Sequence, residues 1–140
     1  MEIFSKGEVA LLSSEAYGIK FRPVYDKKVF FEAITKENRR IVLCSPQSKY
    51  HKNIEAWWSD ITEIQYDFME KYDEAIIIFR LEGSMLCMLN WLDFKAYLNE
   101  ECRRYNTHEK EHWKLYVHRE YIKISGNNNK FNVKITKHLI

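Results

Sequence analysis

The chain has 140 residues, of which 46% are hydrophobic and 30% are charged, with only 4 glycines and 2 prolines. This composition is typical of one folded domain with enough apolar surface for a core, and it excludes disordered, collagen-like and low-complexity chains. No apolar run approaches the ~20 residues of a membrane-spanning helix, and the first ten residues lack a secretory signal pattern. We therefore expect a single domain over residues 1–140, in the cytoplasm and without a membrane partner.

Charge is distributed unevenly along the chain, although the net charge is only +2. Residues 1–52 carry a net charge of +4, residues 53–84 of −6 and residues 101–140 of +5. Basic and acidic surfaces that are separated in this way are typical of proteins that contact the phosphates of nucleic acids, although a mixed solvated surface gives the same counts. DNA or RNA is therefore a candidate partner.

Three cysteines, Cys44, Cys87 and Cys102, lie far apart in the sequence and form no CxxC pair. Their odd number and wide spacing argue against a disulfide framework or a zinc knuckle. We expect them to be reduced thiols that pack as small buried hydrophobic residues.

One helix and three strands are predicted for the first third of the chain. Residues 5–16 have a helical apolar stripe, with Ser5 as a candidate N-cap and Gly18 as the stop signal. The next segments are rich in Val, Ile, Phe and Tyr, which favours strands. They predict an antiparallel meander over residues 19–25, 28–34 and 39–45.

A polar loop and an acidic helix are predicted next. Pro46 ends the third strand, and residues 46–59 are expected to form a loop that carries two lysines and two tryptophans, Lys49, Lys52, Trp57 and Trp58. From Asp60 the apolar spacing is helical to about Tyr72, and Asp60 with Glu63 matches the spacing of a capping box. The helix is therefore expected over residues 60–72.

The remaining elements complete a mixed sheet. Residues 75–79 form a continuous apolar run that is typical of a strand buried on both faces, and residues 85–89 predict a second short strand. Residues 92–105 have helical spacing. Alternation from Trp113 onward, with a turn at residues 126–129, predicts a terminal β-hairpin. The expected fold class is α/β, in the α+β sense, with an antiparallel meander in a mixed sheet and about three flanking helices.

Residues 108–112 read His-Glu-Lys-Glu-His and satisfy the HExxH pattern of zinc metallohydrolases. On a helix, His108 and His112 would face one zinc ion while Glu109 activates its water. The neighbouring residues are charged and lead directly into a strand, which favours an exposed connection. The third ligand candidates are His118, Glu120 and His138.

A second set of residues follows the order of the predicted elements. Glu8 lies on the first helix, Glu32 lies on the second strand of the meander, and residues 40–45 form the third strand. This order resembles the PD-(D/E)xK nuclease superfamily, the restriction-endonuclease-like and Holliday-junction-resolvase-like fold. The resemblance implies that Glu8 and Glu32 bind Mg²⁺ beside a phosphodiester, and it suggests a role in mobile-element or defence biology.

The chain departs from this superfamily on the third strand, where an acid-x-Lys triplet is expected. Residues 42–44 read Val-Leu-Cys instead, so both the acid and the lysine are missing. Lys49, or Lys52, is the candidate for a lysine that has moved along the chain. Loss of one preorganised group costs on the order of 10²–10³-fold in rate. A Mg²⁺-dependent endonuclease with weak or lost activity is the resulting expectation.

Two functions therefore remain open from the sequence. The first is a nuclease-fold domain that binds DNA or RNA through basic and aromatic side chains, with the candidates Lys52, Trp57, Trp58, Arg103 and Arg104. In this case a tryptophan stacks on unpaired bases, whereas the alternative is that the tryptophans fold back over the core. The second is a protein-interaction module, an inhibitor or accessory subunit, that presents the acidic helix 60–73 and the aromatic loop to a protein partner.

Overall fold

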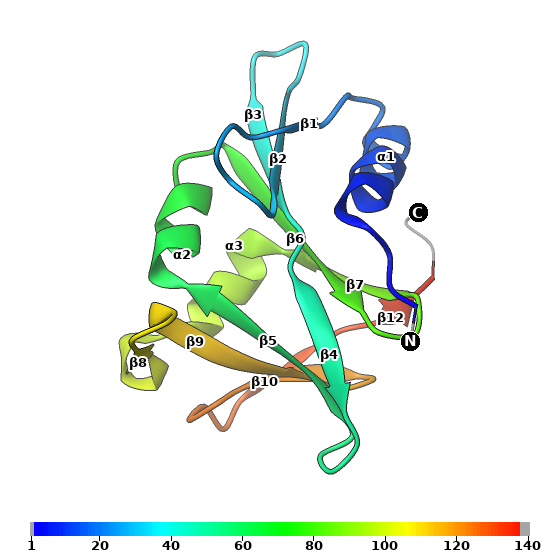
Figure 1. Ribbon diagram of the computed structural model, residues 1–140. Coiled ribbons are helices and arrows are strands. Elements are labelled where there is room, and N and C mark those ends of the chain that lie inside the picture. The colour runs from blue at the N-terminus through cyan, green and yellow to red at the C-terminus, as the bar shows by residue number, and fades with distance from the viewer. Residues whose placement is uncertain (1, 138–140) are drawn as a thin grey trace.

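The computed structural model describes residues 2–137 and consists of a bent mixed β-sheet with three α-helices (Figure 1). The helices are α1 (Lys6–Tyr17), α2 (Glu63–Met69) and α3 (Trp91–Phe94), and two 3₁₀ turns follow at Lys95–Tyr97 and Glu100–Cys102. The strands are β1 (Arg22–Pro23), β2 (Phe30–Ile34), β3 (Arg40–Cys44), β4 (Gln47–His51), β5 (Ala56–Thr62), β6 (Glu74–Leu81), β7 (Met85–Asn90), β8 (Arg104–Asn106), β9 (Lys110–Val117), β10 (Tyr121–Ile124), β11 (Lys130–Asn132) and β12 (Ile135–Thr136). The α+β class expected from the sequence is confirmed.

Helix α1 begins and ends where the sequence predicts. Ser5 accepts a hydrogen bond from the Glu8 backbone N–H, and the Glu8 carboxylate accepts one from the Ser5 N–H, which completes a capping box. Gly18 ends the helix with φ at 66°, a left-handed conformation that glycine adopts without a Cβ clash.

The sheet is mixed, so the predicted meander is matched only in part. Strands β1, β2 and β3 pair in antiparallel fashion, but β3 then pairs in parallel with β6, and β6 also pairs in parallel with the start of β4. The complete order along the sheet is β1-β2-β3-β6-β4-β5-β9-β10-β11, with β7 beside β6, β12 beside β7 and β8 beside β9. As predicted, β6 is buried along almost its whole length.

The predicted loop at residues 46–59 is wrong, because β4 and β5 form an antiparallel hairpin there. Residues 57, 59 and 61 point inward and residues 58, 60 and 62 point outward, which is the period of a strand. The helix that follows therefore starts at Glu63 rather than at Asp60. Its capping box is formed by Thr62 and Gln65 and not by Asp60 and Glu63.

The helix predicted over residues 92–105 is also too long. Helix α3 ends at Phe94, the two 3₁₀ turns follow, and residues 104–106 pair with β9 as strand β8. The predicted turn at residues 126–129 joins β10 to β11, but the preceding arm, predicted as one strand, is divided into β9 and β10, which pair with each other. These strands are part of the large sheet, since β9 also pairs with β5 along six residues. After β11, the chain crosses over so that β12 pairs with β7.

Two apolar clusters form the core. The larger one lies between the two halves of the bent sheet and contains Trp57, Phe79, Leu115 and Ile122 together with residues of α2 and α3. The smaller one lies between α1 and the opposite face of β2, β3 and β6. All three cysteines are free and buried, as predicted, and burial raises the pKa of Cys44 and of Cys87 to about 12. Within residues 2–137, the structure has no helix of the length and hydropathy that crossing a bilayer requires.

The core arrangement leaves one sheet face without a helix. Side chains of β5, β9 and β10 that point inward belong to the larger cluster, and α1, α2 and α3 all pack on the two clusters. The outer face of β4, β5, β9, β10 and β11 therefore lies opposite the face on which the described helices pack. We call it the open face; it carries Lys49, His51, Trp58, Lys114, Tyr116, His118, Tyr121, Lys123 and Lys130.

Candidate nucleic-acid interface

A row of five directly opposed residues crosses the open face. The strand register pairs Lys49 with Trp58, Trp58 with Tyr116, Tyr116 with Lys123, and Lys123 with Lys130. Neighbouring strands lie ~4.8 Å apart, so the row spans roughly 19 Å. Two aromatic rings at its centre are thus flanked on both sides by ammonium groups. We call these five residues the cross-strand row.

Trp58 is held in position from three sides. Its ring stacks on the His51 imidazole at 3.7 Å between centroids and 19° between planes, and the Tyr116 ring meets it edge-on at 5.9 Å. The Lys114 ammonium lies 5.1 Å from the ring centroid, within cation–π range. Trp58 nevertheless remains 37% exposed. An indole that is both fixed and accessible can stack on a planar ligand at little entropic cost.

A pocket of about 350 Å³ opens beside the two aromatic rings of the row. Trp58, Tyr116, His118 and Lys123 line it, together with residues of two turns, Ile54, Ser125 and Gly126. The pocket therefore combines aromatic walls with a lysine. A nucleobase and its phosphate present these two kinds of surface to a protein.

The far end of the open face is basic. His118 stacks on Tyr121 with centroids 4.5 Å apart, and the Lys130 ammonium lies 4.4 Å from the centroid of the Tyr121 ring. Desolvation, followed by the charges of Lys130 and Lys123, lowers the pKa of His118 below its usual range. The surroundings of His118 thus disfavour protonation of its ring. An anion bound beside His118 would favour the protonated ring and raise its pKa.

Sequence reasoning placed Lys49, Lys52, Trp57 and Trp58 in one loop, but the structure separates them. Lys49 and Trp58 belong to the cross-strand row, while Lys52 is exposed in the turn between β4 and β5. Trp57 points the other way: it is 1% exposed, and its indole N–H donates to the Glu82 carbonyl at 2.9 Å. Of the two readings of the tryptophan pair, core packing describes Trp57 and surface exposure describes Trp58.

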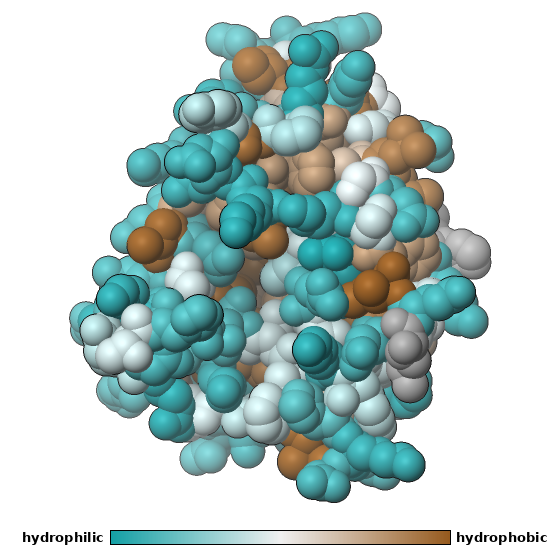
Figure 2. All heavy atoms as spheres, viewed as in Figure 1, coloured by the Kyte–Doolittle hydropathy of each residue, from teal (hydrophilic) through white to brown (hydrophobic). Residues whose placement is uncertain are grey.

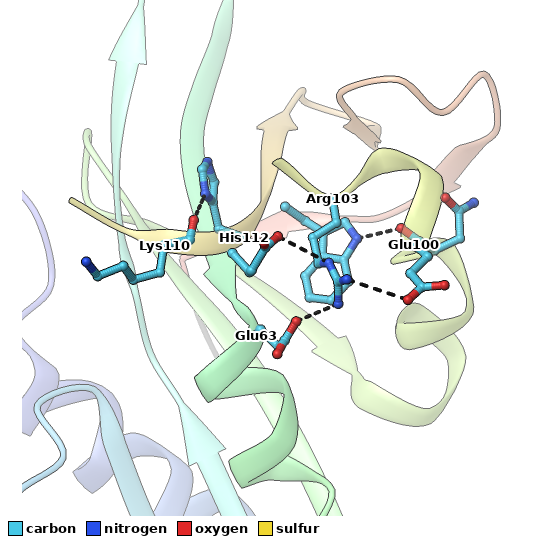
Figure 3. Close-up of polar contacts among 8 residues, drawn as sticks. Glu63, Glu100, Arg103, Lys110 and His112 are labelled. Carbon is cyan, nitrogen blue, oxygen red and sulfur yellow. Dashed lines mark hydrogen bonds and ion pairs between the residues drawn. The ribbon is translucent and has the colours of Figure 1, made fainter. Parts of the chain in front are cut away.

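Arg103 and Arg104 also differ in their surroundings. The Arg103 guanidinium forms ion pairs with the carboxylates of Glu63, Glu100 and Glu111, and Figure 3 shows it between Glu63 and Glu100. Arg104 is exposed and donates to the Ser125 hydroxyl at 2.7 Å, next to the pocket of the open face. Arg104 therefore remains available for phosphate contact, whereas Arg103 is occupied.

The structure does not bring Glu8 and Glu32 together. Glu8 is exposed on α1, which packs against the face of β2 that carries Phe31 and Ala33. Glu32 points to the opposite face, because its position alternates with theirs along the strand. A Mg²⁺ site formed by both carboxylates, as the nuclease resemblance implies, is absent from this arrangement. Lys49, three strands away from β2 along the sheet, does not join either of them.

Both glutamates have structural partners instead. Glu8 caps α1, and its hydrogen bonds to Ser5 lower its pKa. Glu32 accepts a hydrogen bond from the Tyr72 hydroxyl at 2.5 Å and lies opposite Arg22 in the sheet. Desolvation and the hydrogen bond to Glu32 raise the pKa of Tyr72 to about 12.

The HExxH segment does not form a helix. Residues 107–109 make the turn between β8 and β9, His108 is exposed, and His112 is 3% exposed within β9. His108 and His112 are consequently not presented on one helical face to a zinc ion. Of the third ligands considered from the sequence, His118 lies at the far end of β9, Glu120 lies in the next turn, and His138 lies outside the described residues.

The fold instead places Asp60 beside two residues of that segment. Ligand atoms of Asp60, Glu109 and His112 all lie within 4.8 Å of one another, although Asp60 is 49 positions from Glu109 in the sequence. Burial, and then the hydrogen bond and charge of Glu109, raise the pKa of Asp60 to about 7. The pKa of Glu109 is lowered mainly by the same hydrogen bond. Burial and the neighbouring Glu109 thus both disfavour the charged form of Asp60.

The acidic helix offers less free charge than the sequence suggests. Helix α2 covers only residues 63–69, and its Glu63 is paired with Arg103. Glu70, just after the helix, pairs with Lys95 at 2.9 Å and accepts a hydrogen bond from the Trp91 indole. Figure 2 shows a mostly hydrophilic surface on which apolar side chains are scattered, with no broad apolar area on the face in view. Of the acidic residues around α2, Glu63 and Glu70 are therefore already paired with cations of the same chain.

Several residues of the open face were missed from the sequence, chiefly Lys114, Tyr116, Lys123 and Lys130. Their signal was present in the alternation of residues 113–118, which sends Lys114, Tyr116 and His118 to one face of a strand. The sequence did not show which strands pair with β9 on its two sides, because β5 was predicted as loop and helix.

In comparisons with known proteins, no protein-family model, no curated protein and no solved structure matches the chain. Function is therefore inferred from the geometry of the surface.

Proposed function

We propose that this protein binds single-stranded DNA or RNA across its open face. The observation that carries the proposal is the cross-strand row, in which the exposed ring of Trp58 and the half-buried ring of Tyr116 are flanked by Lys49 on one side and by Lys123 and Lys130 on the other. Proteins that bind single strands combine aromatic stacking platforms with a basic surface that follows the phosphates. The row provides both on rigid strands.

A single strand fits this surface better than a duplex. The bases of a duplex are stacked on one another, so that Trp58 and Tyr116 would contact no base face without unstacking the helix. In a single strand, each base can lie on an aromatic ring, while its phosphates reach the lysines. The open face is also a shallow sheet surface and presents no helix to a major groove.

We assign no cleavage step to this surface. The acids that the nuclease resemblance implies, Glu8 and Glu32, lie on opposite faces of another part of the sheet, and both have structural partners. The proposed activity is therefore binding, with stacking and phosphate contacts as its two components.

Fluorescence polarisation with a labelled single-stranded oligonucleotide tests this function. We expect binding at about 50 mM salt that weakens strongly at about 200 mM, because released counterions dominate the affinity of phosphate contacts. A duplex of the same length should bind more weakly. Absence of binding at low salt, or equal binding of duplex and single strand, would refute the proposal.

A further inference from the structure

The cluster of Asp60, Glu109 and His112 lies at the β8–β9 end of the open face. Asp60 projects outward from β5, His112 from β9, and Glu109 from the turn before β9. Two antiparallel strands and a turn therefore position the three side chains, and their ligand atoms lie within 4.8 Å of one another. Small side-chain rotations would bring these atoms to the ~3–3.5 Å separation expected around an ion bound at ~2.1 Å.

His112 is oriented as a metal ligand usually is. The residue is 3% exposed, and its Nδ1 lies 2.9 Å from the Lys110 carbonyl oxygen (Figure 3). Because a carbonyl oxygen only accepts hydrogen bonds, Nδ1 carries the proton and Nε2 of the neutral ring has the free lone pair. Metal-ligating histidines characteristically donate their other N–H to a backbone carbonyl in this way.

The two carboxylates lack the cation that such a pair needs. Among the residues that the structure describes, neither Asp60 nor Glu109 forms an ion pair with lysine or arginine. Lys114, the cross-strand partner of Asp60, has its ammonium over the Trp58 ring instead. Asp60 Oδ1 is buried and has no hydrogen-bond partner. A buried carboxylate oxygen without a partner is costly, and a bound cation would satisfy it.

We propose that Asp60, Glu109 and His112 form a binding site for one divalent transition-metal ion of the Zn²⁺ class. The two carboxylates balance the charge of the ion, and Nε2 of His112 supplies the nitrogen ligand that favours Zn²⁺ over Mg²⁺ or Ca²⁺. Three protein ligands leave a coordination position for water, as in zinc sites that are not purely structural. This site is independent of the proposed nucleic-acid binding.

Equilibrium dialysis and thermal unfolding of the full chain with Zn²⁺ test the site, without any oligonucleotide. We expect one Zn²⁺ per chain and a rise of the melting temperature with Zn²⁺ concentration, as linkage requires. Mg²⁺ at the same concentrations should leave the melting temperature unchanged. Asp60→Asn and Glu109→Gln should each weaken Zn²⁺ binding by at least about tenfold.

His108→Gln is the matched control, because His108 is an exposed imidazole in the same turn as Glu109. This variant should bind Zn²⁺ as the unaltered protein does. His112→Gln alters a buried side chain and is open to misfolding, so Glu109→Gln, in a turn, is the decisive variant. Zn²⁺ binding that survives Glu109→Gln and Asp60→Asn, or that is lost in His108→Gln, would overturn the proposal, as would the absence of stoichiometric binding. Oligonucleotide binding measured with a chelator present keeps the two functions separate.

Discussion

The Trp58 indole and the His51 imidazole stack face to face on the open face, with 3.7 Å between their centroids. The contact crosses the β4–β5 hairpin, and the Lys114 ammonium lies 5.1 Å from the centroid of the same ring, so that the indole remains 37% exposed. A tryptophan fixed in this way has already lost most of its rotational freedom, so that stacking on a base orders little more of the protein.

Trp58→Ala should weaken binding of a single-stranded oligonucleotide by about 5- to 150-fold, which corresponds to the ~1–3 kcal/mol of one stacked base. Tyr25→Ala is the control, because Tyr25 is 95% exposed in the turn between β1 and β2, away from the open face. Polarisation titrations at one salt concentration compare the two variants. Equal affinities would remove Trp58 from the interface.

Lysines of the cross-strand row should determine the salt dependence of binding. Each phosphate contact contributes about −0.7 to the slope of log K against log salt for a single strand. Lys49→Ala, Lys123→Ala and Lys130→Ala should therefore each reduce the slope by up to about 0.7. Lys36→Ala, in the exposed turn between β2 and β3, should leave it unchanged. A slope that responds equally to Lys36 would indicate a diffuse electrostatic attraction.

His118 should make oligonucleotide binding stronger at acid pH. Desolvation and the charges of Lys130 and Lys123 lower its pKa in the free protein, and bound phosphates would offset those charges and favour the protonated ring. Lowering the pH from about 7.5 to 5.5 should increase the affinity more in the unaltered protein than in His118→Gln. Because His51 is present in both proteins, the difference between them reports on His118 alone.

The lowered pKa of His118 also predicts that the free protein becomes less stable at acid pH. A histidine with a lowered pKa in the folded state binds fewer protons there than in the unfolded state, so the free energy of unfolding falls as the pH drops below the ordinary value of 6.5. Denaturant titrations should show a smaller fall in His118→Gln. An identical pH profile in both proteins would contradict the shift.

Tyr72 and Glu32 should behave as a structural pair rather than as part of a metal site. Tyr72→Phe removes the hydrogen bond to Glu32 and should lower the free energy of unfolding by about 1 kcal/mol. Desolvation and then the hydrogen bond and charge of Glu32 raise the pKa of Tyr72 to about 12, so Glu32→Gln should lower that pKa part of the way toward its usual value. Tyrosinate absorbance follows this change. Oligonucleotide binding should stay the same in both variants.

Arg103 and Arg104 should give contrasting phenotypes. Arg103→Met leaves Glu63 and Glu111 without their cation and should cost about 1 kcal/mol of stability, less at high salt, with little effect on oligonucleotide binding. Arg104→Met should weaken binding and leave the melting temperature nearly unchanged, since Arg104 is exposed beside the pocket. The reverse result would place the nucleic acid on the other side of β8.

The sequence by itself determined the elements whose signals are local. The Ser5 cap and the Gly18 stop define α1, and the apolar run of β6 identifies a buried strand, because caps and burial patterns act over a few residues. The uneven distribution of charge along the chain, which suggested a nucleic-acid partner, can likewise be read directly from the sequence.

Only the tertiary structure decided which residues share a surface. Asp60 had helical spacing toward Phe68 and strand alternation with Trp58, and pairing of β5 with β9 along six residues favoured the strand. That pairing brings Trp58 to Tyr116 and Asp60 close to His112. The packing of α1 on β2 separately leaves Glu8 and Glu32 on opposite sides of the sheet. Sheet register depends on contacts between residues that are distant in the chain, and the local pattern carries no record of them.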